Sequence, residues 1–238
     1  MATANEILLS VQNIHTHIGQ FHILEGITVD VPTGQITVLL GRNGAGKTTT
    51  LKSIMGITPP NKGEISFAGQ RLDDRSVHEI ARLGIGYVPE HRAIFTNLTV
   101  AENLRIAERQ PGDLLRKEDF IFGLFPDLKR LYHLGGRQLS GGQQQMLTIA
   151  RALVPDNRLL LIDEPSEGLA PILIEQMMQA IRELSAQTTV LLVEQNFRMA
   201  SQLADRYVII DEGQSVHSGL MADLVQEQAL IQRYLGAA

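Results

Sequence analysis

The chain has 238 residues, 44% of them hydrophobic and 20% charged, which is the balance of an ordinary globular protein with room for a sizeable core. Its formal net charge of -5 leaves no basic excess to neutralise phosphates, so a nucleic acid is not expected as a partner. Because the sequence has no cysteine, disulfides, thiol catalysis and cysteine-ligated metals are excluded.

The beginning of the chain predicts two β-strands. Residues 7–14 and 23–31 are rich in β-branched side chains, and a break at Gly19 and Gln20 separates them. Before them, residues 1–6 have no basic segment followed by an apolar core, and no apolar run anywhere approaches the ~18 residues of a membrane span. We therefore expect a soluble protein whose membrane role, if it has one, comes through a partner.

A glycine-rich stretch follows the apolar run 36–40 and opens a helix that we expect to end near Met55. Glycines accept positive φ and allow a close approach, while a helix N-terminus offers unpaired N–H groups and the positive end of its dipole. The pattern therefore predicts a phosphate-binding loop, in which Lys47 reaches the β- and γ-phosphates and the Thr48 hydroxyl binds Mg²⁺. The stretch consists of Gly41, Arg42, Asn43, Gly44, Ala45, Gly46, Lys47, Thr48 and Thr49.

The middle of the chain changes from strands to helices. Residues 63–69 alternate like a strand, which we expect to pair with the N-terminal hairpin, and a further strand at 85–88 ends at Pro89. From about residue 90 to 155 the pattern is helical and predicts an inserted helical subdomain. Its last helix carries an apolar stripe that is expected to be core: Met146, Ile149, Ala150 and Leu153.

The sheet then resumes. The runs 159–162, 190–193 and 207–210 are continuously apolar, as in strands covered on both faces, and Pro171 is well placed to begin a helix. Strands that alternate with helices imply parallel β-α-β units, so the fold class is α/β with a mainly parallel sheet. Two short helices are expected over residues 220–235.

Two carboxylates, Asp163 and Glu164, follow the strand 159–162, where open α/β sheets bind ligands. Alone, such a pair more often caps a helix or lies in a solvated turn. Together with the phosphate loop it predicts that Asp163 holds Mg²⁺ and that Glu164 polarises the attacking water.

A second anion site is predicted at Ser140, Gly141, Gly142 and Gln143, because a serine and two glycines expose backbone donors where a helix begins. By itself this pattern is also that of a purely structural helix cap. His15 and His17 alternate on a strand, but no third ligand at metal spacing accompanies them, so no metal is expected there.

The stretch 139–143 resembles the signature motif of the ABC ATPases, and it precedes the carboxylate strand as in that family. The resemblance extends over nearly the whole chain, through an aromatic-loop region near Ile18, a Q-loop region at 88–90, a D-loop region at 166–171 and a switch region at 193–196. It implies a P-loop NTPase core with a mainly parallel sheet, an N-terminal antiparallel β subdomain and the inserted helical subdomain. These would form a single domain over 1–238, with the core and antiparallel part at about 1–89 and 156–238.

The family further implies a head-to-tail dimer that sandwiches ATP between the phosphate loop of one subunit and Ser140, Gly141, Gly142 and Gln143 of the other. Three positions depart from the general pattern. Ile18 stands where an adenine-stacking aromatic is usual, with Phe21 three residues later as its candidate substitute. Glu90 replaces the Q-loop Gln that contacts Mg²⁺, and Gln195 replaces the catalytic switch His.

With Glu90 and Gln195 at these positions, the sequence resembles the ATP-binding subunits of branched-chain amino-acid importers. That resemblance implies a second ATP-binding subunit, integral membrane permease subunits and, indirectly, an extracytoplasmic substrate-binding protein. It also implies a cytoplasmic location, peripheral on the inner face of the plasma membrane through the permeases.

Three alternatives remain open at this point. The ATPase of a lipid or lipopolysaccharide exporter shares every motif. A soluble ABC protein acting on ribosomes or DNA usually has two cassettes or a long coiled-coil insertion, and this sequence has neither. An inactive regulatory subunit is disfavoured because Lys47, Asp163 and Glu164 are all present.

Overall fold

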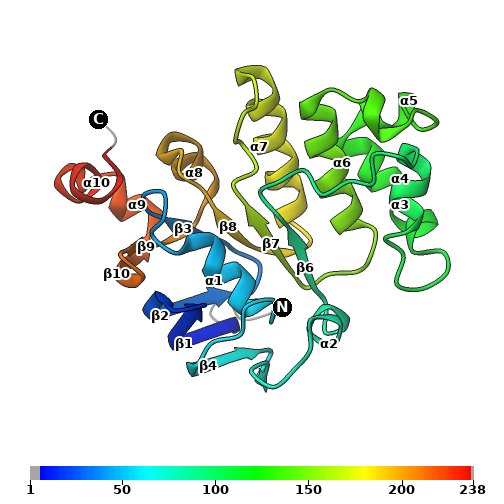
Figure 1. Ribbon diagram of the computed structural model, residues 1–238. Coiled ribbons are helices and arrows are strands. Elements are labelled where there is room, and N and C mark those ends of the chain that lie inside the picture. Colours follow the sequence, from blue (N-terminus) through cyan, green and yellow to red (C-terminus); the bar gives the residue numbers. More distant parts are fainter. Residues whose placement is uncertain (1–5, 237–238) are drawn as a thin grey trace.

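Two β-sheets organise the part of the chain that the computed structural model describes, residues 6–236 (Figure 1). The smaller sheet is antiparallel, with the order β2-β1-β4-β5, and the larger has the order β10-β9-β3-β8-β7-β6. The strands are β1 (Ile7–Ile18), β2 (Phe21–Pro32), β3 (Ile36–Leu40), β4 (Lys62–Phe67), β5 (Gln70–Arg71), β6 (Ile85–Val88), β7 (Leu159–Asp163), β8 (Thr189–Val193), β9 (Arg206–Asp211) and β10 (Gln214–Leu220).

The helices lie between and around these sheets. They are α1 (Lys47–Ile54), α2 (Val77–Arg82), α3 (Val100–Arg105), α4 (Asp113–Leu124), α5 (Pro126–Arg130), the short 3₁₀ helix η1 (Gly136–Gln138), α6 (Gly141–Leu153), α7 (Pro171–Ser185), α8 (Phe197–Leu203), α9 (Met221–Leu224) and α10 (Gln228–Leu235). In Figure 1 the green helices α3 to α6 gather at one side of the larger sheet, and the red C-terminal helix α10 lies at the opposite side.

The N-terminal hairpin has longer strands than its sequence predicts. Only Gly19 and Gln20 form the turn, with Gly19 at φ 60°, so that Ile18 and Phe21 are directly paired strand ends rather than loop residues. The expected strand after the phosphate loop is confirmed, since β4 pairs antiparallel with β1.

The larger sheet confirms the predicted parallel arrangement, because β6, β7, β8, β3 and β9 pair in parallel. Its last strand, β10, pairs antiparallel with β9 and was not expected from the sequence. That strand is polar and mostly exposed at the edge of the sheet, so it lacks the apolar signal of the other strands.

Alternation along the parallel strands explains their continuous apolar runs. In β7, Leu159 and Leu161 face one core, together with α1 and the smaller sheet. Leu160 and Ile162 face a second core, together with α6, α7 and α8. Both faces of the strand are thus covered, as expected for a parallel sheet between two layers.

The predicted helical patterns also hold. The stripe on α6 is buried at Met146, Ile149, Ala150 and Leu153, which confirms it as core. Pro171 is the first residue of α7, where its missing N–H costs no helical hydrogen bond. Among residues 6–236, no helix combines the length and the apolar composition needed to cross a membrane.

Candidate active site

The carboxyl ends of four neighbouring parallel strands meet at one edge of the larger sheet, and each continues into one of the sequence motifs. β3 leads into the phosphate loop, β6 into Pro89 and Glu90, β7 into Glu164, and β8 into Glu194 and Gln195. Open α/β sheets bind ligands at this edge. The parallel topology therefore gathers motifs that lie as far apart in the sequence as Gly41 and Gln195.

The phosphate loop has the backbone geometry that its glycines predict. Gly46 caps α1 with φ 109°, and a Cβ there would come within 2.7 Å of Leu24 Cδ2. Gly41 has φ 153°, and a Cβ on it would collide with the carbonyl oxygen of Ile210. Both positions therefore require glycine, because of conformation and of space together. The helix then begins with Lys47, so its free N–H groups point into the loop.

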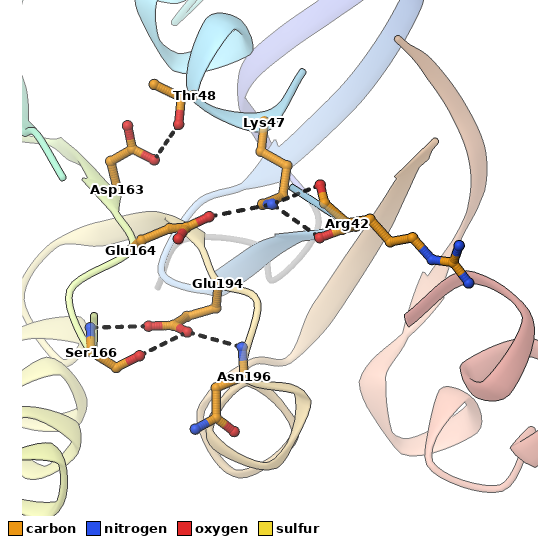
Figure 2. A network of polar contacts seen from close by, with 9 residues as sticks. Arg42, Lys47, Thr48, Asp163, Glu164, Ser166, Glu194 and Asn196 are labelled. Carbon is orange, nitrogen blue, oxygen red and sulfur yellow. Dashed lines mark hydrogen bonds and ion pairs between the residues drawn. The ribbon is translucent and has the colours of Figure 1, made fainter. Parts of the chain in front are cut away.

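Lys47 connects the loop to the carboxylate strand. Its side chain is 4% exposed, and Nζ donates to the carbonyl oxygens of Gly41 at 2.9 Å and Arg42 at 3.2 Å. The same Nζ lies 3.3 Å from Oε1 of Glu164, and Figure 2 shows these two side chains pointing toward each other. The loop therefore holds a buried cation whose partner is the carboxylate predicted to activate water.

Asp163 is fully buried at the end of β7. The Thr48 hydroxyl donates to Oδ1 at 3.0 Å, and the Tyr87 hydroxyl donates to Oδ2 at 3.4 Å. The pKa of Asp163 is raised to about 6, chiefly by burial. The nearby charges of Glu90 and Glu164 contribute to this shift, while the two hydroxyls oppose it. Tyr87 was not predicted as a site residue, because a tyrosine in a strand suits core packing equally well.

These groups fit a bound Mg²⁺. A hydroxyl and carboxylates are hard oxygen donors, and Mg²⁺ in nucleotide sites takes one or two carboxylates and completes its shell with water and phosphate. Within residues 6–236, no three His, Cys, Asp or Glu side chains are arranged to hold a metal by themselves. Thr48 and Asp163 would therefore hold the ion only together with a nucleotide, with Glu90 at the cleft wall beside them.

A cleft of about 390 Å³ opens over this cluster. It collects most residues of the predicted phosphate loop, together with Ile18 at the strand end where an adenine contact was expected. Two residues that the sequence did not single out for binding, Ile23 and Glu167, also lie on its wall. The lining consists of Ile18, Ile23, Asn43, Gly44, Gly46, Lys47, Thr48, Thr49, Glu90, Glu164 and Glu167.

Other predicted residues lie beside the cleft. Gly41 and Ala45 are buried in the loop, and the Arg42 guanidinium points away, donating to the carbonyl oxygen of Arg233 in α10 at 3.3 Å (Figure 2). Phe21, the candidate substitute for an adenine-stacking ring, is 64% exposed across the hairpin from Ile18.

The signature residues form the N-terminus of α6. Ser140 is an exposed cap whose Oγ accepts from the Gln143 N–H at 3.3 Å, while Gln143 Oε1 accepts from the Ser140 N–H at 2.9 Å. Gly141 and Gly142 follow the cap, which leaves their N–H groups in the first turn. In the described part of the chain, none of these residues lines the cleft at Lys47.

Gln195 also lies apart from the phosphate-loop cleft. Its side chain is exposed and lines a second hollow of about 760 Å³, between the start of α8 and the C-terminal helices. The other residues of this hollow are Asn196, Phe197, Arg198, Val225, Gln228, Ile231 and Gln232.

Glu194 is another site residue that was not predicted from the sequence. Its side chain is 1% exposed, and its carboxylate accepts from the backbone N–H of Ser166, from the Ser166 hydroxyl and from the N–H of Asn196, at 3.3, 3.1 and 3.3 Å (Figure 2). Burial raises the pKa of Glu194 to about 7, although these three hydrogen bonds oppose the shift.

Comparison with known proteins agrees with this geometry. A model of the ABC transporter family matches residues 24–167. The chain is 39% identical over 236 residues to the high-affinity branched-chain amino acid transport ATP-binding protein BraG of Pseudomonas aeruginosa, which covers 96% of this chain and 100% of that protein. It is 32% identical over 233 residues to the lipopolysaccharide export system ATP-binding protein LptB of Acidithiobacillus ferridurans, with 96% and 97% covered.

A solved structure of the ATP-binding subunit of an ABC transporter superposes with a TM-score of 0.82 at 30% identity, covering 94% of each chain. The family match, the full-length relatives and this structural likeness are consistent with the strand-edge arrangement of the phosphate loop and the carboxylates. The chain therefore belongs to the ABC transporter family, and it is an ATP-binding, ATP-hydrolysing subunit of such a transporter.

Proposed function

We propose that this ATPase powers an importer of amino acids, of the branched-chain class, through separate membrane subunits. The observation that carries the proposal is the identity of 39% over the full length of a branched-chain amino acid transport ATP-binding protein. The replacements Glu90 and Gln195, which resemble that subfamily, support it from the sequence.

In this proposal the cleft residues divide the work of hydrolysis. Lys47 binds the β- and γ-phosphates, and the N–H groups of residues 43–49 surround them, because the start of α1 concentrates donors and positive potential there. Thr48 and Asp163, with Glu90, hold Mg²⁺, which would neutralise phosphate charge. Glu164 accepts a proton from the attacking water.

Two copies or two related subunits would complete the site. The N–H groups in the first turn of α6 suit a phosphate, yet in residues 6–236 they lie outside the chain's own cleft. A head-to-tail partner would bring its Ser140, Gly141, Gly142 and Gln143 to the nucleotide held by Lys47. Gln195 would then reach the γ-phosphate when the dimer closes.

The partners follow from the same proposal. Helices within about 90–155 would form the subdomain that moves when the dimer closes, in one ABC ATPase domain over 1–238. They would pass that movement to integral permease subunits, with an extracytoplasmic substrate-binding protein on the other side. The chain would thus lie on the cytoplasmic face of the plasma membrane, with no nucleic-acid partner.

The alternative is export of a lipid or lipopolysaccharide, supported by the relative LptB at 32% identity. A soluble ABC ATPase without a transport role is a weaker alternative, because the first relatives are transport or export proteins over nearly their full length.

Copurification from native membranes would identify the permeases. The reconstituted complex should then show ATP turnover that rises when a leucine-loaded binding protein is added outside proteoliposomes, and not when the empty binding protein is added. Stimulation by lipopolysaccharide, with no response to leucine, would establish the exporter instead.

A further inference from the structure

Glu164 has a backbone conformation that its side chain does not favour. Its φ is 42°, in the left-handed region that non-glycine residues rarely adopt. Such a conformation costs on the order of 1 kcal/mol or more and persists only where surrounding contacts determine it. The contacts that hold this turn therefore decide where the Glu164 carboxylate points.

Two backbone hydrogen bonds hold the turn. The Glu164 N–H donates to the carbonyl oxygen of Val193 at 3.0 Å, and the Glu167 N–H donates to the carbonyl oxygen of Glu164 at 3.2 Å. The first bond ties the turn to the end of β8, next to Glu194. The Ser166 carbonyl oxygen accepts from the Leu169 N–H at 3.2 Å, which leaves the N–H and the hydroxyl of Ser166, in the middle of the turn, to be held by some other group.

Glu194 is that group. Its Oε1 accepts from the Ser166 N–H at 3.3 Å and its Oε2 accepts from the Ser166 hydroxyl at 3.1 Å. Its own N–H donates to the carbonyl oxygen of Leu39 at 3.2 Å, so Glu194 is anchored on β3, the strand that enters the phosphate loop. The carboxylate thus fixes the turn after Glu164 relative to the strand that carries Lys47.

A bare carboxylate at 1% exposure is costly, and the nearby Glu164 adds repulsion. A neutral side chain would avoid both costs. None of the roles proposed for hydrolysis uses this group. Its three hydrogen bonds, all to two short segments at the strand edge, point to a positioning task.

We propose that Glu194 is a positioning residue that clamps the turn at 164–167 through Ser166, and thereby keeps the Glu164 carboxylate directed at Lys47 and the cleft. The inference rests on the proposed role of Glu164 in hydrolysis. Glu194 itself does not touch the nucleotide; it acts through the backbone of its neighbour.

The variant Glu194→Gln tests the clamp with little change in volume. The glutamine amide can adopt two orientations. Its NH₂ group faces the backbone N–H of Ser166 in one and that of Asn196 in the other, so in either case two donors meet and one hydrogen bond is lost. The variant Ser166→Ala removes only the hydroxyl contact and leaves the buried carboxylate in place. Asp113→Asn is the matched control, since Asp113 is also buried and accepts from backbone N–H groups, but on α4.

The first measurement is activity-independent. Amide hydrogen exchange over residues 164–168 should accelerate by about tenfold in Glu194→Gln, and less in Ser166→Ala, because the lost hydrogen bonds release the turn. Asp113→Asn should leave this segment unchanged. Unaltered exchange in both clamp variants would overturn the inference, whatever the ATPase activity of the wild type.

The second measurement separates positioning from general stability. Turnover should fall by about 10- to 100-fold in Glu194→Gln, the cost of misplacing a reacting group by roughly 1 Å, while the Kd for a fluorescent ATP analogue stays unchanged. Asp113→Asn should keep wild-type turnover. Loss of nucleotide affinity in parallel with turnover would instead mean that Glu194 supports the fold only.

A double variant identifies the residue through which Glu194 acts. Adding Glu194→Gln to Glu164→Gln should lower the residual turnover no further, because the clamp has no catalytic carboxylate left to position. A further loss equal to that in the wild-type background would contradict the inference. A wild-type protein that binds ATP and never hydrolyses it would instead contradict the catalytic role of Glu164. The hydrogen-exchange measurement would still test the clamp in that case, because it does not depend on hydrolysis.

Discussion

Lys47 Nζ lies 3.3 Å from Oε1 of Glu164, so the cation of the phosphate loop and the carboxylate beyond β7 form an ion pair across the cleft. Both side chains are largely shielded from water, at 4% and 15% exposure. The carbonyl oxygens of Gly41 and Arg42 complete the surroundings of Nζ. A γ-phosphate entering the cleft would therefore compete with Glu164 for the same ammonium group, and would release the carboxylate toward the attacking water.

Lys47→Ala should weaken nucleotide binding as well as turnover, because it removes the buried charge that balances the β- and γ-phosphates. Charge-assisted hydrogen bonds of about 1.5–3 kcal/mol correspond to a loss of affinity of roughly 10- to 100-fold. Titration with a fluorescent ATP analogue measures the effect. Lys52→Ala, at the other end of the same helix, is the control, and unchanged affinity in Lys47→Ala would mean that this loop does not bind the nucleotide.

Glu164→Gln should bind ATP and lose turnover, because the amide has nearly the same shape and cannot accept a proton from water. General-base catalysis contributes about 10²–10⁴-fold, which sets the expected loss. The variant should also accumulate an ATP-bound closed dimer, which size-exclusion chromatography in the presence of ATP would detect. Retention of more than about half of the wild-type rate would refute the assignment of Glu164 as the base.

Ser140→Arg should spare ATP binding by the isolated subunit and abolish turnover at the site that this signature faces. A bulky cation at the start of α6 would block the approach of a phosphate to the free N–H groups there. Ser140→Ala is the control, because it loses only the cap, at about 1 kcal/mol of stability. Mixing the Arg variant with subunits that lack Lys47 shows which site fails. An Arg variant that fails to bind ATP by itself would contradict a composite site.

Local sequence was sufficient for the elements whose signal lies within a few residues. The glycines at 41, 44 and 46 predict the phosphate-binding loop, and the apolar run before Asp163 predicts a strand covered on both faces. The strand β10 could not be predicted, because its residues are mostly polar and exposed, and their hydrogen-bond partners lie on β9 and β2. The order of the strands in the sheet could not be predicted from local sequence patterns either, because it depends on how the connecting helices pack against the sheet.

Site residues were predicted where the residue types of one short motif indicate their function. They were missed where the function depends on burial by segments distant in the sequence. Glu194 follows a strand and reads as a solvated residue, yet Ser166, 28 residues earlier, folds over it. The direction of Arg42 could not be predicted either, because its acceptor is the Arg233 carbonyl of the C-terminal helix. One sequence signal could have indicated Glu194. It directly follows an apolar strand, and the polar segments that contain Ser166 and Asn196 follow strands that end at the same edge of the sheet.

The pKa of Glu194 predicts how stability varies with pH. Folding raises this pKa from its ordinary 4.5 to about 7, chiefly by burial, so the folded state takes up a proton between these values. The contribution of Glu194 to the free energy of unfolding is therefore fully present below pH 4.5 and is lost as the pH rises through 7.

Urea unfolding of the nucleotide-free protein at several pH values measures this contribution. Relative to Glu194→Gln, the wild type should lose about 3 kcal/mol between the two pKa values, because the glutamine does not titrate. The other carboxylates are common to both proteins and cancel in the comparison. A difference between the two proteins that stays constant with pH would show that Glu194 has an ordinary pKa in the folded state.

The last prediction concerns Gln195, which stands where the family has a catalytic histidine. An amide can donate a hydrogen bond to the γ-phosphate but does not titrate near neutrality. Gln195→Ala should therefore lower turnover at this subunit's own site by roughly 10- to 100-fold, the worth of one hydrogen bond to a charged group, with ATP affinity less affected. Gln195→His should introduce a new pH dependence between about 6 and 8.

Single-turnover hydrolysis against pH, with the partner's site inactivated, tests both variants. Because Gln195 is exposed in the single chain and lines the hollow beside α10, its effect should appear only under conditions where the dimer forms. If Gln195→Ala matches the wild type in the dimer at every pH, the γ-phosphate must be contacted by another residue.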